Sequence, residues 1–109
     1  MQSSLSELET TYITLQAEIG ALLAACQTQD QKDALTAQYV AARTAYWSCI
    51  NKAFHDDDPT VVSLTNQLDA SNKQLQTYVA ELSDINTTIA NITQVVTVGA
   101  QLAAKVIAV

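Results

Sequence analysis

The chain has 109 residues, a net charge of −6 at pH 7 and few charged side chains, 15% of the total. Binding to nucleic acid phosphates or to anionic membrane surfaces needs clustered Lys and Arg, and this chain has five such residues in all. With only two glycines and one proline it has little turn-forming material. We therefore expect a single domain over 1–109 that is built from a few long helices.

The first residues contain neither the basic region nor the apolar core of a signal peptide. No run of about 18 apolar residues is present, so no ordinary transmembrane helix is expected. These features predict a cytoplasmic protein, and secretion by a route that uses no cleaved signal is the alternative.

A first helix is expected from about residue 4 to residue 55. Ser4 and Glu7 have the spacing of a capping box, with Ser4 as the N-cap. Apolar residues then recur at alternating intervals of three and four, as in a coiled coil: Leu5, Leu8, Tyr12, Leu15, Ile19, Leu22 and Cys26. The same register resumes after the polar stretch 27–33, at Val40, Arg43, Trp47, Ile50 and Phe54. The spacing therefore favours one continuous helix through 27–33.

The polar stretch leaves a second interpretation open. Thr28 and Gln31 also have capping-box spacing, so a break near 28–33 could start a new helix. Against this, the stretch contains no Gly, Pro or Asn, and Gln and Lys are good helix formers. A break here would give a three-helix bundle with one long helix.

The clearest break lies at 56–58. The residue before a proline avoids helical geometry, and Asp58 followed by Pro59 is a strong helix start. The second helix, 59–109, carries its own apolar stripe: Val61, Leu64, Leu68, Leu75, Tyr78, Leu82, Ile85, Ile89, Ile92, Val96, Ala103 and Val106. Each helix would be about 75 Å long. Folded back at the break, they form an all-α antiparallel helical hairpin in which Arg43 faces Ser71.

A lone hairpin buries only the seam, the contact between its two apolar stripes. We therefore expect two hairpins to associate into a four-helix bundle. The expected interface lies beside the seam and consists of Tyr39, Tyr46, Val95, Leu102 and Val109. The alternative is that these residues pack inside a three-helix bundle. The sequence thus predicts a non-catalytic interaction or assembly protein whose partner is a second copy or another helical protein.

Residue combinations typical of catalysis, cofactor binding or metal binding are missing from the sequence. His55 beside Asp56–Asp58 suggests a metal site, but helix capping at the turn explains this cluster better. Cys26 and Cys49 lie too far apart along helices for a disulfide, and neither has a nearby His or a CxxC partner. We therefore expect no enzyme activity, no catalytic residue, no cofactor, no metal and two free thiols.

The segment 85–109 suggests an alternative function. Its single charged residue is Lys105, and it is rich in β-branched residues, which are indifferent helix formers. Such a segment could bind a partner or enter a membrane after rearrangement. The alternative function is therefore a membrane-active hairpin, for example a toxin component, with 85–109 as the active segment.

Two families of secreted helical hairpins resemble this chain in outline. The Trp-x-Gly (WXG) family consists of acidic, signal-less hairpins of about this size, although Trp47-Ser48-Cys49 lacks the family's glycine. Type III secretion needle subunits are similar in turning at a stretch like Asp58-Pro59, but they are shorter. The resemblance implies a hairpin fold and a secretion-system substrate, and it assigns no functional residue here.

Overall fold

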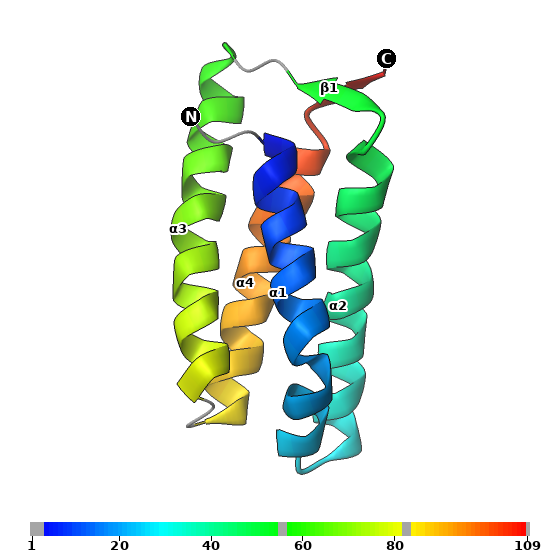
Figure 1. The fold of residues 1–109 in the computed structure, drawn as a ribbon, viewed down its shortest axis with the longest axis vertical. Coiled ribbons are helices and arrows are strands. Elements are labelled where there is room, and N and C mark those ends of the chain that lie inside the picture. The colour runs from blue at the N-terminus through cyan, green and yellow to red at the C-terminus, as the bar shows by residue number, and fades with distance from the viewer. Residues whose placement is uncertain (1–3, 55–56, 82–83, 109) are drawn as a thin grey trace.

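We describe residues 4–54, 57–81 and 84–108 of a computed structural model, except for the side chains of residues 53 and 106–108. The described chain forms four helices, shown in Figure 1: α1 (Ser4–Ala25), α2 (Gln29–Cys49), α3 (Pro59–Glu81) and α4 (Ile85–Ala103). Two short strands, β1 (Lys52–Phe54) and β2 (Val106–Ala108), pair antiparallel at one end of the bundle.

The all-α fold is confirmed, whereas the expected two-helix hairpin is wrong. Each of the two expected long helices is broken once, so a single chain supplies the four helices that two copies were expected to supply. The molecule measures 43 × 21 × 18 Å, which is far shorter than an uninterrupted helix of about 75 Å. The three-helix alternative is wrong too, because it includes only the first of the two breaks.

The first break lies between α1 and α2, inside the stretch that was expected to be continuous helix. Thr28 has extended backbone angles, and its Oγ1 accepts a hydrogen bond from the Gln31 amide at 3.1 Å. Gln31 Oε1 accepts in return from the Thr28 amide, also at 3.1 Å. This is the capping box of the alternative interpretation, and such a cap contributes about 1 kcal/mol to helix stability.

The second break lies before α4 and was not expected. Asp84 is extended and caps the helix, since its Oδ1 accepts from the Asn86 amide at 3.0 Å. Its Oδ2 accepts from the Thr87 hydroxyl at 3.0 Å. The spacing of apolar residues at intervals of three and four continues through this point. The sequence pattern therefore did not indicate the cap. The expected start of a helix at Pro59 is confirmed, with Asp58 Oδ1 accepting from the Thr60 amide at 2.7 Å.

The helix expected to reach residue 55 ends at Cys49 instead. Residues 52–54 form β1, which pairs with β2 in the register Lys52 with Ala108 and Phe54 with Val106. The second long helix correspondingly ends at Ala103, before β2. His55 and Asp56, the other members of the expected turn cluster, lie outside the described residues.

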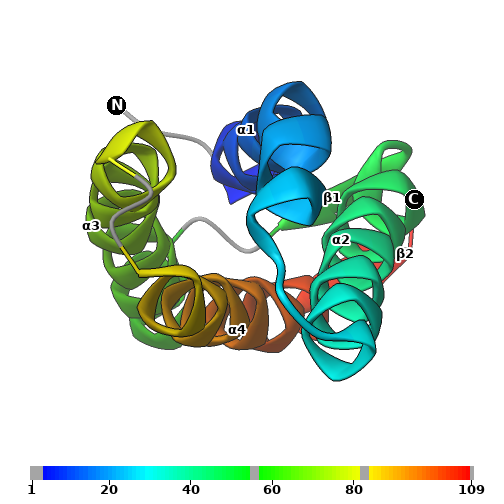
Figure 2. The same cartoon turned by 90° about the horizontal axis from the view of Figure 1, so that it is seen from below.

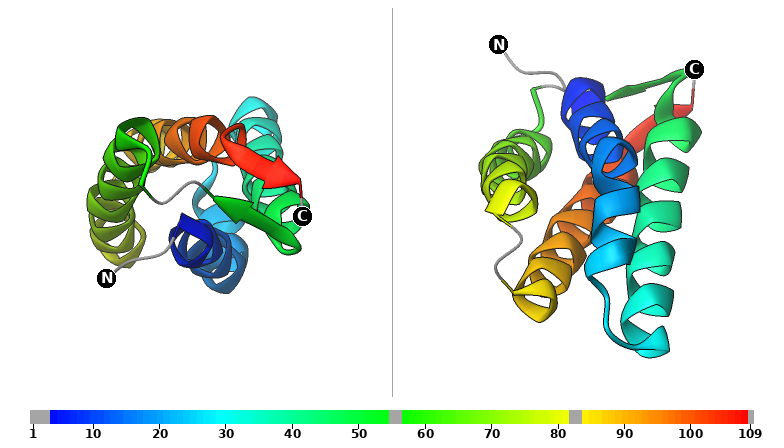
Figure 3. Two further views of the ribbon diagram at one scale, coloured as in Figure 1. Left: turned by 90° about the horizontal axis from the view of Figure 1, so that it is seen from above. Right: turned by 60° about the horizontal axis from the view of Figure 1, so that its bottom comes forward.

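Around the bundle the helices follow the order α1, α2, α4, α3, as Figure 2 shows. α1 and α3 run in the same direction, as do α2 and α4, so each helix has one parallel and one antiparallel neighbour (Figure 1). Although α2 and α3 follow one another in the chain, they lie on opposite corners of the bundle. β1 lies over the end of the bundle between them (Figure 3, left).

The core lies along the bundle axis. Its fully buried apolar side chains are Leu15, Leu22, Leu35, Cys49, Leu68, Leu75, Ile92, Val95 and Leu102. The expected stripes of α1, α3 and α4 supply most of this core. The expected seam of α2 is wrong, because Val40, Trp47 and Ile50 are exposed. α2 instead turns Leu35, Ala42 and Cys49 toward the core, three residues spaced by seven.

The parallel pair α1 and α3 is joined by buried hydrogen bonds. Ser4 Oγ lies 2.9 Å from Thr65 Oγ1, and the Thr11 hydroxyl donates to Asn72 Oδ1 at 2.6 Å. Asn72 Nδ2 donates both to the Glu7 carbonyl at 3.0 Å and to its carboxylate Oε1 at 3.1 Å. Ser4 and Glu7, expected to form a capping box, therefore connect α1 to α3.

Candidate functional site

The four described residues of the expected interface do not form one surface. Val95 and Leu102 are fully buried in the core of the single chain. Tyr39 and Tyr46 are half-buried on α2, and Val109 lies outside the described residues. The reason is that α4 packs against the other helices of its own chain, where a second hairpin was expected. Contacts between chains through Val95 and Leu102 would require the bundle to open.

Tyr39 and Tyr46 belong to an aromatic cluster that joins α1 to α2. The Tyr12 ring stacks on both, with centroid distances of 5.9 Å and 5.8 Å. Trp47 meets Tyr12 edge-on at 6.2 Å. The Tyr46 hydroxyl donates to Glu9 Oε2 at 2.6 Å, and Gln16 Nε2 donates to the Tyr12 oxygen at 3.3 Å. These rings therefore hold two helices of one chain together.

The surroundings of the cluster raise the pKa of two of its tyrosines, Tyr12 and Tyr46. The hydrogen bond to the Glu9 carboxylate is the main cause that raises the pKa of Tyr46 above its ordinary value, and desolvation adds to it. Burial is the main cause that raises the pKa of Tyr12, while the nearby Arg43 acts in the opposite direction. Both phenols therefore remain hydrogen-bond donors, and neither is suited to act as a base near pH 7.

A second feature of α2 is a mainly apolar, partly exposed stripe, the α2 stripe, which consists of Val40, Arg43, Trp47 and the C-cap residue Ile50. The exposed fractions of Val40, Trp47 and Ile50 are 40%, 56% and 45%. Their spacing of three, four and three residues places all four side chains on one face of the helix. Arg43 lies over the Trp47 ring, with its Cζ atom 5.2 Å from the ring centroid. It also lies 5.9 Å from the Tyr39 ring and not at Ser71 as expected.

The α2 stripe is part of the heptad pattern that predicted a partner helix in the sequence. In the folded chain α2 buries a different face, so these heptad positions stay partly exposed, with Trp47 touching α1 through the edge-on contact with Tyr12. α2 is consequently apolar on two sides, one inside the core and one exposed. An exposed apolar face of this kind is typical of an interaction surface.

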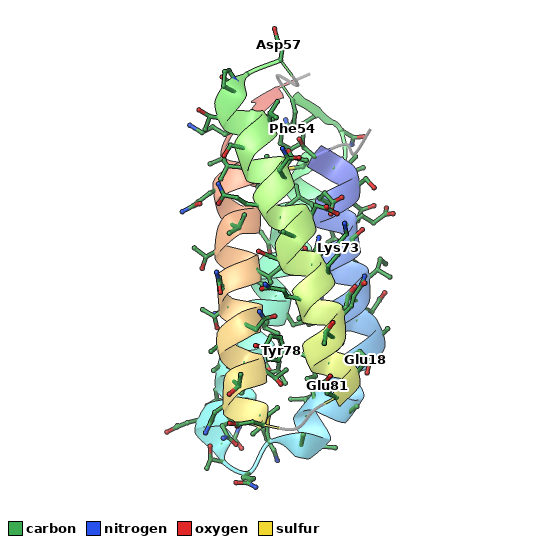
Figure 4. All side chains as sticks on the ribbon, turned by 90° about the vertical axis from the view of Figure 1, so that its left-hand side faces the viewer. Glu18, Phe54, Asp57, Lys73, Tyr78 and Glu81 are labelled. Atoms are coloured by element: carbon green, nitrogen blue, oxygen red, sulfur yellow. The ribbon has the colours of Figure 1, made fainter. Side chains whose placement is uncertain are left out.

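The lower half of the α1 and α3 pair opens into a shallow groove of about 340 Å³, the α1–α3 groove. Its lining includes Ile13, Ala17, Glu18, Gln76, Val79 and Ala80. Figure 4 shows Glu18 of α1 and Glu81 of α3 toward the lower end of this side. Glu18 forms no ion pair with any described residue. No sequence pattern indicated this groove, because it depends on how α1 and α3 are offset.

The described residues offer no metal centre, since no three His, Cys, Asp or Glu side chains among them gather closely enough to hold an ion. Cys26 and Cys49 are both free thiols, and Cys49 is fully buried. The Cys26 thiol donates to the Leu22 carbonyl at 3.3 Å. Within the same part of the chain, no helix has both the length and the hydropathy needed to cross a membrane.

Comparison with protein families, with curated proteins and with solved structures finds no match to this chain. The four-helix bundle also differs from the two-helix hairpin that the WXG and needle-subunit resemblances imply. The surfaces of the molecule are therefore the basis for any functional conclusion.

Proposed function

We propose that this protein is a non-catalytic assembly protein that self-associates through the α2 stripe. The observation that carries the proposal is an exposed helix face with coiled-coil spacing on a helix that already fills the core with a neighbouring face. The residue types support it as well. Trp and Arg are enriched at the centres of protein interfaces, where they dominate the binding energy.

The energetic argument rests on apolar area. Burying a Val or Ile side chain that would otherwise be exposed contributes roughly 1.5–3 kcal/mol. Trp47 has a larger ring, and more than half of the residue faces solvent. Joint burial of Val40, Trp47 and Ile50 would therefore offset part of the entropy lost on association. By contrast, the apolar residues of α4 that the membrane-active alternative needs are mostly buried in the core, so we favour assembly.

Sedimentation velocity over micromolar to near-millimolar concentrations tests the proposal. We expect the mass-average sedimentation coefficient to rise with concentration and Trp47→Ser to abolish the rise. Trp47 is the only tryptophan of the chain, so its fluorescence emission should shift to shorter wavelength as the wild type associates.

A matched pair of variants tests whether association depends on the α2 stripe or on exposed apolar residues in general. Val40 and Val62 are exposed to similar degrees, 40% and 44%, but Val62 lies on α3. Val40→Ser should weaken association, whereas Val62→Ser should leave it unchanged. A wild-type chain that stays monomeric throughout this range, or one that associates equally well without Trp47, would contradict the proposal.

A further inference from the structure

The α1–α3 groove and the α2 stripe have complementary chemistry. The groove is lined by four apolar residues, by the uncharged Thr14 and Gln76, and by one carboxylate, Glu18, which has no described cationic partner. The α2 stripe presents apolar side chains around one cation, Arg43, which forms no ion pair with a described carboxylate. A guanidinium that meets a carboxylate in a partly desolvated contact forms strong, geometrically specific hydrogen bonds.

We infer that the α1–α3 groove of one copy receives the α2 stripe of another, with Arg43 opposite Glu18. This inference rests on the proposed function, because it names the surface that the stripe binds. Val40 and Trp47, on either side of Arg43, then pack against the apolar part of the groove lining, in which Ile13 is 49% exposed. The groove lining covers residues 13–18 of α1, about 7.5 Å of helix, so about one to two turns of α2 can lie against it.

The shape of the groove suits a helix. Ala17 and Ala80 are small, so the backbone of an incoming helix can approach α1 and α3 closely. The volume of about 340 Å³ lies at the low end of the range for ligand pockets, and it is open along one side. It therefore fits the side chains of a helix face better than an enclosed small molecule.

The charges also argue against the simplest alternative, a symmetric contact between two α2 stripes. Arg43 lies between Val40 and Trp47, near the middle of the stripe. A two-fold axis there would place the two Arg43 side chains close together, and like charges across an interface are unfavourable. Pairing with the groove replaces this repulsion with an attraction.

The contact is heterologous, since the stripe and the groove share no residue and belong to different helices. Figure 2 shows α1 between α2 and α3, so the stripe belongs to a helix that takes no part in the groove. Each copy that is bound by its stripe still has its groove free. Such contacts produce a ring where the rotation closes and a filament where it does not.

A charge exchange tests the inference. Arg43→Glu places two carboxylates in the contact, and Glu18→Arg places two guanidinium groups there. Each variant alone should self-associate at least about tenfold more weakly than the wild type. An equimolar mixture should regain association, because the introduced glutamate of one variant then meets the introduced arginine of the other. In the reverse orientation, the unaltered Arg43 meets the unaltered Glu18.

Glu81→Arg is the control, because it makes the same change in net charge at an exposed residue that does not line the groove. It should associate as the wild type does. Circular dichroism and thermal melting check the folding of each variant, and the neutral variants Arg43→Gln and Glu18→Gln replace any that fails. Each neutral variant alone should self-associate more weakly than the wild type.

The outcomes separate the inference from the proposal on which it rests. If Glu18→Arg associates like the wild type while Trp47→Ser does not, the groove is not the partner surface, but the α2 stripe still is. A mixture that remains as dissociated as the single charge-reversed variants also overturns the inference. If Glu18→Arg and Trp47→Ser both associate normally, both statements are wrong.

Discussion

α1 contacts its two neighbours in different ways. Toward α2 it uses stacked aromatic rings, with Tyr12 between Tyr39 and Tyr46. Toward α3 it uses buried hydrogen bonds, in which Thr11 and Glu7 meet Asn72. Stacked rings tolerate small displacements, because offset geometries over a range of distances are all favourable. Hydrogen bonds tolerate much less, because they weaken steeply once distance or angle departs from the optimum.

The difference follows from how the helices are connected. α1 and α2 are joined by a short capped turn at Thr28, which already limits how far one helix can slide along the other. α1 and α3 are parallel, so no short turn can connect them, and their side chains must set the register. The two hydrogen-bonded pairs Ser4–Thr65 and Thr11–Asn72 have the same separation of 61 residues and lie one heptad apart. Buried polar groups are known to fix helix register in this way.

The largest effect is expected for Asn72→Ala. The substitution removes three buried hydrogen bonds and leaves the Glu7 carboxylate without its amide donor. We expect a loss of about 2–4 kcal/mol in the free energy of unfolding, measured by urea denaturation. Asn66→Ala, at an exposed position of the same helix, should change it by less than about 0.5 kcal/mol. Equal losses for the two variants would show that the α1–α3 hydrogen bonds do not stabilise the fold.

Tyr12→Leu tests the aromatic side of α1 and should have a somewhat smaller effect. Leucine retains apolar burial but loses three ring contacts. We expect a loss of about 1.5–3 kcal/mol in the free energy of unfolding. Tyr78→Leu, at a partly exposed position on α3, should lose less than about 1 kcal/mol. A Tyr12 variant that is clearly less stable than Asn72→Ala would reverse the ranking of the two contacts.

The smallest effect concerns pH and the link from Tyr46 to Glu9. The pKa of Tyr46 is raised in the folded state above its ordinary value of 10.0, mainly by the hydrogen bond to Glu9. A raised pKa stabilises the fold while the phenol is protonated, so this contribution is complete below about pH 10 and is lost as the pH rises through the folded pKa. Tyr46→Phe should therefore lose stability less steeply than the wild type above pH 10. Urea denaturation at several alkaline pH values measures this slope, and parallel slopes would contradict the assignment.

Much of the helical content follows from apolar spacing, and so do the buried faces of three helices. Leu15, Leu68 and Ile92 are core residues because they recur every three or four positions, which leaves a helix with one apolar side to bury. The start of α3 was also predictable, since Asp58 and Pro59 are strong local signals.

The face that α2 buries could not be predicted by the same argument. The heptad register continued from α1 across the break by coincidence, although the two helices are separate elements. α2 has two candidate faces, and the one that continues the heptad register of α1, with Trp47 and Ile50, is the exposed one. Which face is buried depends on the positions of α1 and α4 beside it, which are tertiary contacts.

The candidate site was harder still to predict. Tyr39 and Tyr46 were expected beside the apolar seam. Tyr12, on which they stack, was expected in the seam itself, facing the second long helix. Glu18 resembles any solvated carboxylate in the sequence. Its place in a groove depends on which residues of α1 and α3 lie side by side, and that is a tertiary contact.

The position of β1 has a consequence for the order in which the molecule is completed. β1 lies between α2 and α3 in the chain, but its hydrogen-bonding partner β2 follows α4. Because synthesis proceeds from the N-terminus, β1 is made before residues 106–108. Until then the strand has no partner in the fold, and its backbone amides and carbonyls must be hydrated. The pairing of β1 with β2 over the end of the bundle is therefore a late step in the folding of each newly made chain.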